Sequence, residues 1–548
     1  MESNSNNKKL KIIIYIIIAL IIFLNIFILL YKSKKKEEKL KTTNVNLSTL
    51  SYDDGTNLKV YTQDDFNTFY EDYKNNNLSD IYVTKFLFDG VGMYKEYDLD
   101  DFTQNGKDYE AKVLEANVVN INTAGNIILS GELTGMIAVD TNNKKADTNI
   151  VLNGVKIDTD SNKIPAIYVY NKDITYTESK VTIKTNEGTK NYIEGGNLKK
   201  ISLIPSDDLN SYASKYNGYN LINYNAYNNY YGVYKSNEID NVLFAKITAD
   251  NEDLNNGDPY YYYKASGAIS SDIDLYFEGK GYLEVTSKNK EGIESKGNLE
   301  LLGGTGDYVV NAEDDCLNTT TDKTENKNAR NSITIDVNSL YAKVSMDADE
   351  GDGIDSNGTL TINNGTIVTI ARPGADSGID SEDDIHINGG MIISTGDMYD
   401  QISNESKQNF IVLSFNDMPI ENTIITLLDS NDNVVMSYKS DRTYSNLIYS
   451  SSNLKEGTYY LFKDGEVTGS LNNGYYSNVT SYVKGIKLGY VSTESMNNRK
   501  QMPNDNSNMT PPNRDSGMAL EEQLSTNSEF KISGVSNMFS GIRELVTE

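Results

Sequence analysis

Acidic side chains recur at a nearly constant interval between residues 291 and 384. Carboxylates on neighbouring strands of a sheet lie roughly 4.8 Å apart. Like charges that close are unfavourable unless a cation lies among them or some of them are protonated. Ca²⁺ suits such a column because it binds about six to eight hard oxygens in flexible geometry. The sequence therefore predicts a calcium site, whose candidate ligands are Asp314, Asp315, Asp352 and Asp355, followed by Glu291, Glu294, Asn318 and Asp380.

Two further acidic groups lie in turns beside these residues. Asp and Asn favour turns and tolerate left-handed backbone, so the role of a solvated turn residue stays open for each acidic residue taken singly. The further groups are Asp347, Asp349 and Glu350, and Glu382, Asp383 and Asp384.

A repeat positions these acidic residues. Its apolar residue occurs at 269, 293, 317, 354 and 379, with spacings of 24, 24, 37 and 25 residues. A fixed period of this size means that each repeat buries its apolar face against its neighbours. Because a strand rises about 3.3 Å per residue, one repeat can form a coil of short strands. We expect an all-β fold, a right-handed parallel β-helix (a solenoid).

Strand side chains alternate between the two faces, so the repeat also predicts which side chains share a column. The apolar column is Ile269, Ile293, Leu317, Ile354 and Ile379, and it points inward. The next, outward column is Ser270, Glu294, Asn318, Asp355 and Asp380. A small hydroxyl column follows inside the coil: Ser271, Ser295, Thr319, Ser356 and Ser381.

The N-terminal segment predicts a membrane anchor. An apolar run of about 20 residues can span a bilayer, and no cleavage motif of a signal peptide follows the run. We expect a single-pass protein of the cell membrane with most of the chain outside the cell. The expected parts are 1–11, cytoplasmic tail; 12–31, transmembrane signal anchor; 32–55, stalk; 56–400, β-helix with a Tyr/Asn-rich insertion at 200–265; 401–492, a β-rich region or cap; and 493–548, a largely disordered tail.

Composition narrows the class of function. The chain has 50 Lys and Arg against 78 Asp and Glu, a net charge of −28, which repels nucleic acid. Cys316 is the one cysteine and His386 the one histidine, which rules out an intrachain disulfide and makes a Cys–His pair or a His-rich zinc site untenable. No phosphate-binding loop is present. No catalytic residue is predicted, and the oligomeric state stays open.

Three segments resemble a known family. The runs 353–365, 151–155 and 454–460 are similar to the clostridial carbohydrate-binding domain family, over about residues 110–490. Members have a right-handed parallel β-helix similar to that of pectate lyases. The resemblance implies a cell-surface protein that binds plant or acidic polysaccharide, with calcium held on the helix.

Three functions follow from these observations. The first is a calcium-bound polysaccharide-binding module, in which tyrosines stack on sugar rings; the candidate platforms are Tyr260, Tyr261, Tyr262, Tyr263 and Tyr276, with Tyr282 and Tyr308. The second is a calcium-dependent polysaccharide lyase of the pectate type; Lys296 and Arg372 lie close to the acidic residues in the sequence, but neither stands out as the catalytic base. The third is a surface adhesin or structural protein without glycan specificity.

Overall fold

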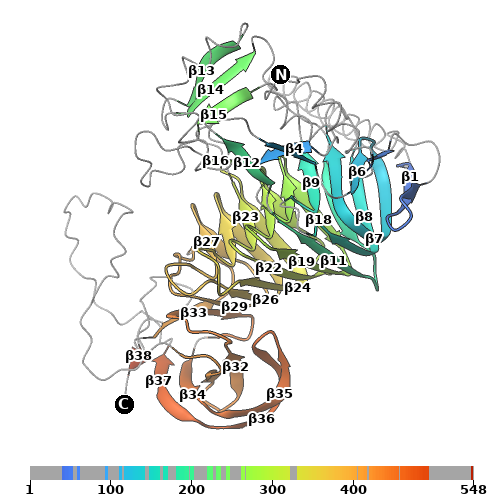
Figure 1. Ribbon diagram of the computed structural model, residues 1–548. Helices are drawn as coiled ribbons and strands as arrows, with labels where there is room; N and C mark the ends of the chain where they lie inside the picture. Colours follow the sequence, from blue (N-terminus) through green and yellow to red (C-terminus); the bar gives the residue numbers. More distant parts are fainter. Residues whose placement is uncertain are drawn as a thin grey trace, which may run out of the picture.

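The structure is a computed structural model of the 548-residue chain. Every element assigned to the described residues is a β-strand (Figure 1), so the predicted all-β fold is confirmed. Side chains and backbone are described for 40–52, 117–141, 147–160, 164–169, 180–196, 267–320, 330–403, 405–415, 419–455 and 457–490. A few isolated residues, and the backbone of short strands between and after these ranges, are described as well.

Most strands lie in three columns, in which each strand pairs in parallel with the strand one turn later along the chain. The core side of the first column is filled by buried apolar residues from successive turns, for example Ile150, Ile183 and Phe277, which pair in register. Its strands are β1 (Thr42–Asn46), β7 (Gly125–Asp140), β8 (Thr148–Asp158), β10 (Val181–Thr185), β18 (Leu275–Gly279), β21 (Leu299–Leu301), β24 (Ile333–Val344), β26 (Leu360–Ile370) and β28 (Ile385–Ile387).

The second column continues from the first, because β7, β8, β24 and β26 are long enough to contribute to both. Its inward side chains, such as Leu283 and Val285, are fully buried. The strands that belong to it alone are β11 (Lys190–Gly195), β19 (Tyr282–Ser287), β22 (Asp307–Ala312) and β29 (Met391–Gly396).

The third column contains the repeat found in the sequence. Ile269, Ile293 and Leu317 pair in register, and so do Ser270, Glu294 and Asn318, which confirms the predicted columns of side chains. The register continues to Asp355 and Asp380. The strands of this column, besides β7, are β6 (Asn117–Ile121), β9 (Ile167–Tyr170), β17 (Ile269–Ser271), β20 (Ile293–Ser295), β23 (Leu317–Thr319), β25 (Ile354–Ser356) and β27 (Asp380–Ser381).

The three columns together form a stack of turns, and this stack begins earlier in the chain than the sequence predicted. Residues 42–46, expected in the stalk, form β1 and pair in parallel with β7. The alternating residues Val45 and Leu47 are buried in the same core as the later turns, which explains the pairing. The neighbouring strands at this end are antiparallel: β2 (Ser51–Tyr52) pairs with β1, and β3 (Leu58–Tyr61) pairs with β6.

The Tyr/Asn-rich segment leaves the columns as antiparallel strands. β12 (Leu198–Ser202) pairs with β16 (Tyr261–Ala265) at the base of the segment. Between them β13 (Tyr219–Asn225), β14 (Tyr230–Lys235) and β15 (Val242–Lys246) form a three-stranded sheet, drawn in green at the top of Figure 1. A separate hairpin joins β4 (Met93–Glu96) to β5 (Glu110–Val113).

Antiparallel strands end the stack at its C-terminal side. β33 (Asn446–Ser451) pairs with β29 of the last turn and with β30 (Phe410–Ser414). The orange strands of Figure 1 form a second sheet with a hydrophobic core that also includes Ile370 and Ile393 of the stack. This sheet contains β31 (Ile424–Leu428), β32 (Val434–Lys439), β34 (Thr458–Lys463), β35 (Glu466–Asn472), β36 (Tyr475–Val483), β37 (Ile486–Ser492) and β38 (Leu545–Val546).

Within the described part of the chain, no helix has the length and apolar character needed to cross a membrane. The predicted anchor at 12–31 lies outside the described residues, as does nearly all of the predicted tail at 493–548.

Candidate functional site

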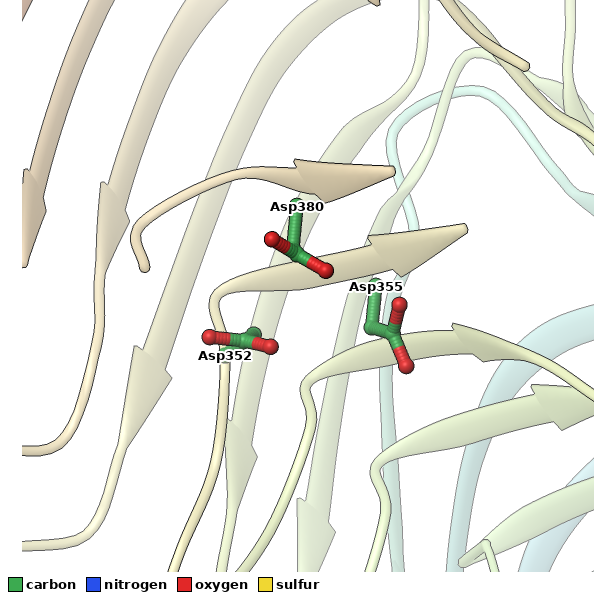
Figure 2. A group of neighbouring side chains, drawn as sticks. All are labelled: Asp352, Asp355 and Asp380. Carbon is green, nitrogen blue, oxygen red and sulfur yellow. The ribbon is translucent and has the colours of Figure 1, made fainter. Parts of the chain in front are cut away.

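Three of the predicted metal ligands meet on the third column. Asp352 precedes β25, Asp355 lies within it, and Asp380 begins β27 on the next turn. One carboxylate oxygen of each lies within 4.8 Å of the others, and all three side chains are partly buried. Figure 2 shows the three carboxyl groups side by side, with Asp380 one turn beyond the other two. The repeat creates this group because the two strands pair in register, Asp355 beside Asp380.

Asn318 extends the group by one turn in the other direction. Its side-chain amide donates to Asp315 Oδ2 at 2.6 Å and to Asp355 Oδ2 at 3.2 Å. Its own carbonyl oxygen Oδ1 is buried and accepts no hydrogen bond from any described residue. A buried acceptor without a donor is costly, and a cation would satisfy it.

The aspartates that enter the turns also have a structural role. Asp315 Oδ1 accepts a hydrogen bond from the Asp352 amide at 2.7 Å, and Asp352 Oδ1 accepts one from the Ser377 amide at 2.5 Å. Each carboxylate therefore caps the backbone of the following turn. A structural role in the turn therefore explains one oxygen of Asp352. It does not explain why this carboxyl group lies beside those of Asp355 and Asp380.

Glu291 and Glu294 lie one turn further back and are both buried. Glu294 was expected to point outward, but it is only 2 % exposed and accepts hydrogen bonds from the hydroxyls of Ser270 and Thr320, at 3.2 and 3.5 Å. Glu291 is 9 % exposed, and its Oε2 has no donor among the described residues. Two buried oxygens of the predicted ligand set, Glu291 Oε2 and Asn318 Oδ1, thus have no hydrogen-bond partner in the described part of the chain.

Asp314 is neutralised by a residue that the sequence analysis missed. Its carboxylate forms an ion pair with Lys290, whose ammonium group also lies 3.4 Å from Glu350. Lys290 lies 24 residues before Asp314, which is one repeat period. The repeat spacing could therefore have predicted that the two side chains are neighbours. Asp314 is therefore a weaker candidate ligand than the triad.

Burial and mutual repulsion raise the pKa values of the acidic residues on the third column. Burial, followed by the charges of Asp315 and Asp380, raises the pKa of Asp352 to about 10 and that of Asp355 to about 8. Burial and the Asp314 charge raise the pKa of Asp315 to about 7. Burial and the Glu294 charge raise the pKa of Glu291 well above its usual range. Without a cation, the column retains protons near neutral pH.

This donor set suits a hard cation. Carboxylate and amide oxygens are the ligands that Ca²⁺ prefers, whereas soft metals select thiolates. The nearby thiol of Cys316 is fully buried, and burial raises its pKa well above the ordinary value.

The two other predicted acidic groups are not part of the triad. Asp347, Asp349 and Glu350 are exposed. Glu382 forms an ion pair with Arg330 at 3.0 Å, and Asp383 and Asp384 are exposed.

The predicted tyrosine platforms are dispersed. Tyr276 is half-buried on β18, with the Lys180 ammonium 3.7 Å from its ring centroid, so a cation already covers one face. Tyr308 is buried in the core and cannot face a ligand, whereas Tyr282 lies partly exposed on β19. Tyr261, Tyr262 and Tyr263 belong to β16, whose side chains are outside the description, and Tyr260 lies outside the described residues.

The two basic residues considered for lyase chemistry both bind protein groups. Lys296 lies 3.0 Å from Asp272. Arg372 donates to the Ala348 carbonyl at 2.5 Å and to Asp376 at 3.3 Å.

Comparison with known proteins adds a family to this geometry. The sequence matches the family described as "Carbohydrate-binding domain-containing protein" over residues 115–211 and 236–440, more than half of the chain. The protein belongs to this carbohydrate-binding domain family. The match spans the third column and the whole acidic triad, so the candidate site lies inside the family domain. The unmatched gap includes all of β13 and β14, which leave the columns. No curated protein and no solved structure gives a match.

Proposed function

We propose that this protein is a calcium-bound, extracellular carbohydrate-binding protein that recognises acidic polysaccharide. Membership of the carbohydrate-binding domain family carries the first half of the proposal. The second half rests on the acidic column within the family domain, where buried oxygens of Glu291 and Asn318 have no partner among the described residues.

The electrostatics of the column support calcium. Three carboxylates within 4.8 Å of one another are mutually repulsive when ionised. A divalent cation would remove that repulsion and supply a partner for the buried Asn318 oxygen. Asp352, Asp355 and Asp380 would hold the ion, with Asn318 Oδ1 as a further oxygen donor.

Calcium would also explain how an acidic surface binds an acidic ligand. A uronate carboxylate approaching the bare column meets like charges and is repelled. With calcium in place, the uronate carboxylate can complete the coordination of the ion, because Ca²⁺ accepts ligands of variable number and direction. The proposed ligand class is therefore a uronate-containing polysaccharide of plant type.

The wider setting belongs to the same proposal. The parallel columns support a right-handed β-helix similar to that of pectate lyases. The apolar run at 12–31 supports a single-pass anchor that keeps the domain at the cell surface. We favour binding over catalysis, because Lys296 and Arg372 are both held by protein groups.

A pull-down on insoluble pectate, with calcium or with chelator, tests the proposal. The double variant Asp352→Asn/Asp355→Asn keeps the shape of both side chains and the acceptor for the Ser377 amide. It should weaken calcium binding at least about tenfold by titration calorimetry and abolish retention on pectate.

The matched control is Asp347→Asn/Asp349→Asn, which removes the same charge from exposed positions and should bind calcium and pectate normally. Retention of the unaltered protein that is equal in calcium and in chelator would contradict the calcium part. Absence of retention on any polysaccharide would contradict the carbohydrate part.

A further inference from the structure

A shallow depression lies on the outward face of the second column, on a different side of the stack from the acidic column. It has a volume of about 330 Å³, near the lower end of the ~300–1,000 Å³ typical of small-ligand sites. β8, β11 and β19 form its floor in parallel register. The lining residues are Lys156, Tyr192, Ile193, Glu194, Glu284 and Thr286.

Tyr192 is the distinctive residue of this depression. It projects from β11 between Lys156 and Glu284 on the two neighbouring strands, and 40 % of its side chain is exposed. Its ring meets the Tyr282 ring edge to face, with centroids 6.1 Å apart. An exposed aromatic ring held by a second ring offers the flat apolar surface on which the C–H face of a pyranose stacks.

The polar groups around Tyr192 are held in place before any ligand arrives. The Tyr282 hydroxyl donates to Glu284 Oε2 at 2.7 Å, and Lys288 lies 2.6 Å from Glu194 Oε1. Beneath the ring, the Asn191 side chain accepts from the Val155 amide at 3.1 Å and donates to the Tyr282 carbonyl at 3.0 Å. These contacts connect the three strands and hold the side chains around the depression, so few side chains would have to become ordered when a ligand binds.

The charges select the kind of sugar. Two carboxylates, Glu194 and Glu284, line the depression and can accept hydrogen bonds from sugar hydroxyls. Glu194 is already paired with Lys288, so Glu284 is the carboxylate whose charge disfavours an ionised uronate. Lys156 is exposed and forms no ion pair with any described residue, and Thr286 adds a hydroxyl. This mixture suits a ligand that is rich in hydroxyls and without charge.

We propose that the depression around Tyr192 binds a neutral glycan, independently of calcium. The proposal rests on the proposed carbohydrate-binding function and adds a second subsite to it. Tyr192 provides the stacking surface, and Glu194, Glu284 and Thr286 provide hydrogen bonds to hydroxyls. The protein then carries two saccharide sites of opposite preference, one for uronate through calcium on the third column and one for neutral sugar on the second.

Affinity gel electrophoresis of the full chain tests this arrangement, with hydroxyethylcellulose, galactomannan or polygalacturonate in the gel. At least one neutral polysaccharide should retard the protein equally in calcium and in chelator. Tyr192→Ala should weaken that binding about tenfold or more and leave calcium-dependent binding to polygalacturonate within about twofold. Tyr192→Phe should bind as the unaltered protein does, because the ring and not the hydroxyl makes the contact.

Tyr52→Ala is the matched control, since Tyr52 is similarly exposed, at 43 %, but lies on β2 away from the depression. Its binding to neutral glycan should not change. Neutral-glycan binding that survives Tyr192→Ala overturns the inference, and so does a protein that binds polygalacturonate alone, which leaves the proposed function standing. A protein that binds none of the polymers overturns both.

Discussion

Single residues of the acidic column combine two roles that are usually assigned to different positions. One carboxylate oxygen of Asp352 accepts a hydrogen bond from the backbone of the following turn. The same carboxyl group lies beside those of Asp355 and Asp380. A substitution by Ala would therefore remove the backbone cap and the proposed calcium ligand together. Substitution by Asn separates them, because the amide oxygen still accepts from the Ser377 amide.

The raised pKa values of the buried aspartates predict a pH dependence of stability. In chelator, the pKa of Asp315 is about 7 and that of Asp355 about 8, both above their ordinary value of 3.8. Between pH 4 and 8 the folded chain then holds protons that the unfolded chain has lost. The free energy of unfolding should fall as pH rises through this window. Thermal unfolding at a series of pH values measures it.

Saturating calcium provides the control for that prediction. Under the proposed function calcium binds the ionised carboxylates, so the stabilising effect of calcium should grow as pH rises. The melting temperatures with and without calcium should therefore diverge from acid to neutral pH. Parallel curves in the two conditions would show that the column does not couple protons to a cation.

At the scale of elements, register decides which residues meet. The sequence repeat correctly predicted that Ser270, Glu294, Asn318, Asp355 and Asp380 share one column, because each has the same offset from a buried apolar residue. Alternation along a strand determines which face of the sheet a side chain occupies. The repeat period determines which residue lies beside it on the next turn. All-β architecture and the members of the acidic column were therefore accessible from the sequence.

Burial of the column and the position of Tyr192 were not accessible in this way. Glu294 has an outward offset, yet hydroxyls from two other turns enclose it, and no periodicity reports such contacts. Tyr192 lies on a strand between Lys156 and Glu284, which are 36 residues before it and 92 residues after it. The interruption at 200–265 hides that pairing from any search for a fixed period.

Gly353, the residue before Ile354 of the inward apolar column, limits how closely neighbouring turns can pack. A Cβ atom on Gly353 would lie 2.4 Å from the Gly378 carbonyl oxygen and 2.8 Å from Thr369 Cβ. We predict that Gly353→Ala lowers the free energy of unfolding by about 1–3 kcal/mol, since backbone must move to admit the methyl group. Urea unfolding in the presence of calcium measures the change.

Cys316→Ala is the internal comparison, because Cys316 occupies the equivalent position one turn earlier and already carries a side chain. Removing its buried sulfur should cost about 1 kcal/mol. Equal stability of Gly353→Ala and the unaltered protein would mean that the turns separate more easily than the packing indicates.

At the scale of the whole molecule, one arginine joins the stack to the C-terminal sheet. Arg442 is 2 % exposed, and its guanidinium donates to the carbonyls of Val344 and Ala371, at 2.8 and 3.1 Å, at the ends of β24 and β26. We predict that Arg442→Ala destabilises the protein by about 2–4 kcal/mol, because two buried acceptors lose their donor. Thermal unfolding and limited proteolysis between 400 and 460 would detect the loosened end.

Lys484→Ala serves as the matched control for Arg442→Ala. Lys484 forms an exposed ion pair with Asp432 within the same sheet, and exposed pairs contribute about 1 kcal/mol or less. A loss of stability as large as that of Arg442→Ala would mean that charge, and not the buried hydrogen bonds, holds this end of the protein.

The parallel columns also bear on how such a chain can change its length. Each turn hydrogen-bonds to the turn before it and the turn after it, so a whole turn can be duplicated in the middle while both ends keep their antiparallel closures. A duplicated 353–377 segment would bring its own Asp355 and its own inward Ile354. Reach along a polymer could then grow by gene duplication in steps of one turn, with each new turn adding carboxylates to the same face.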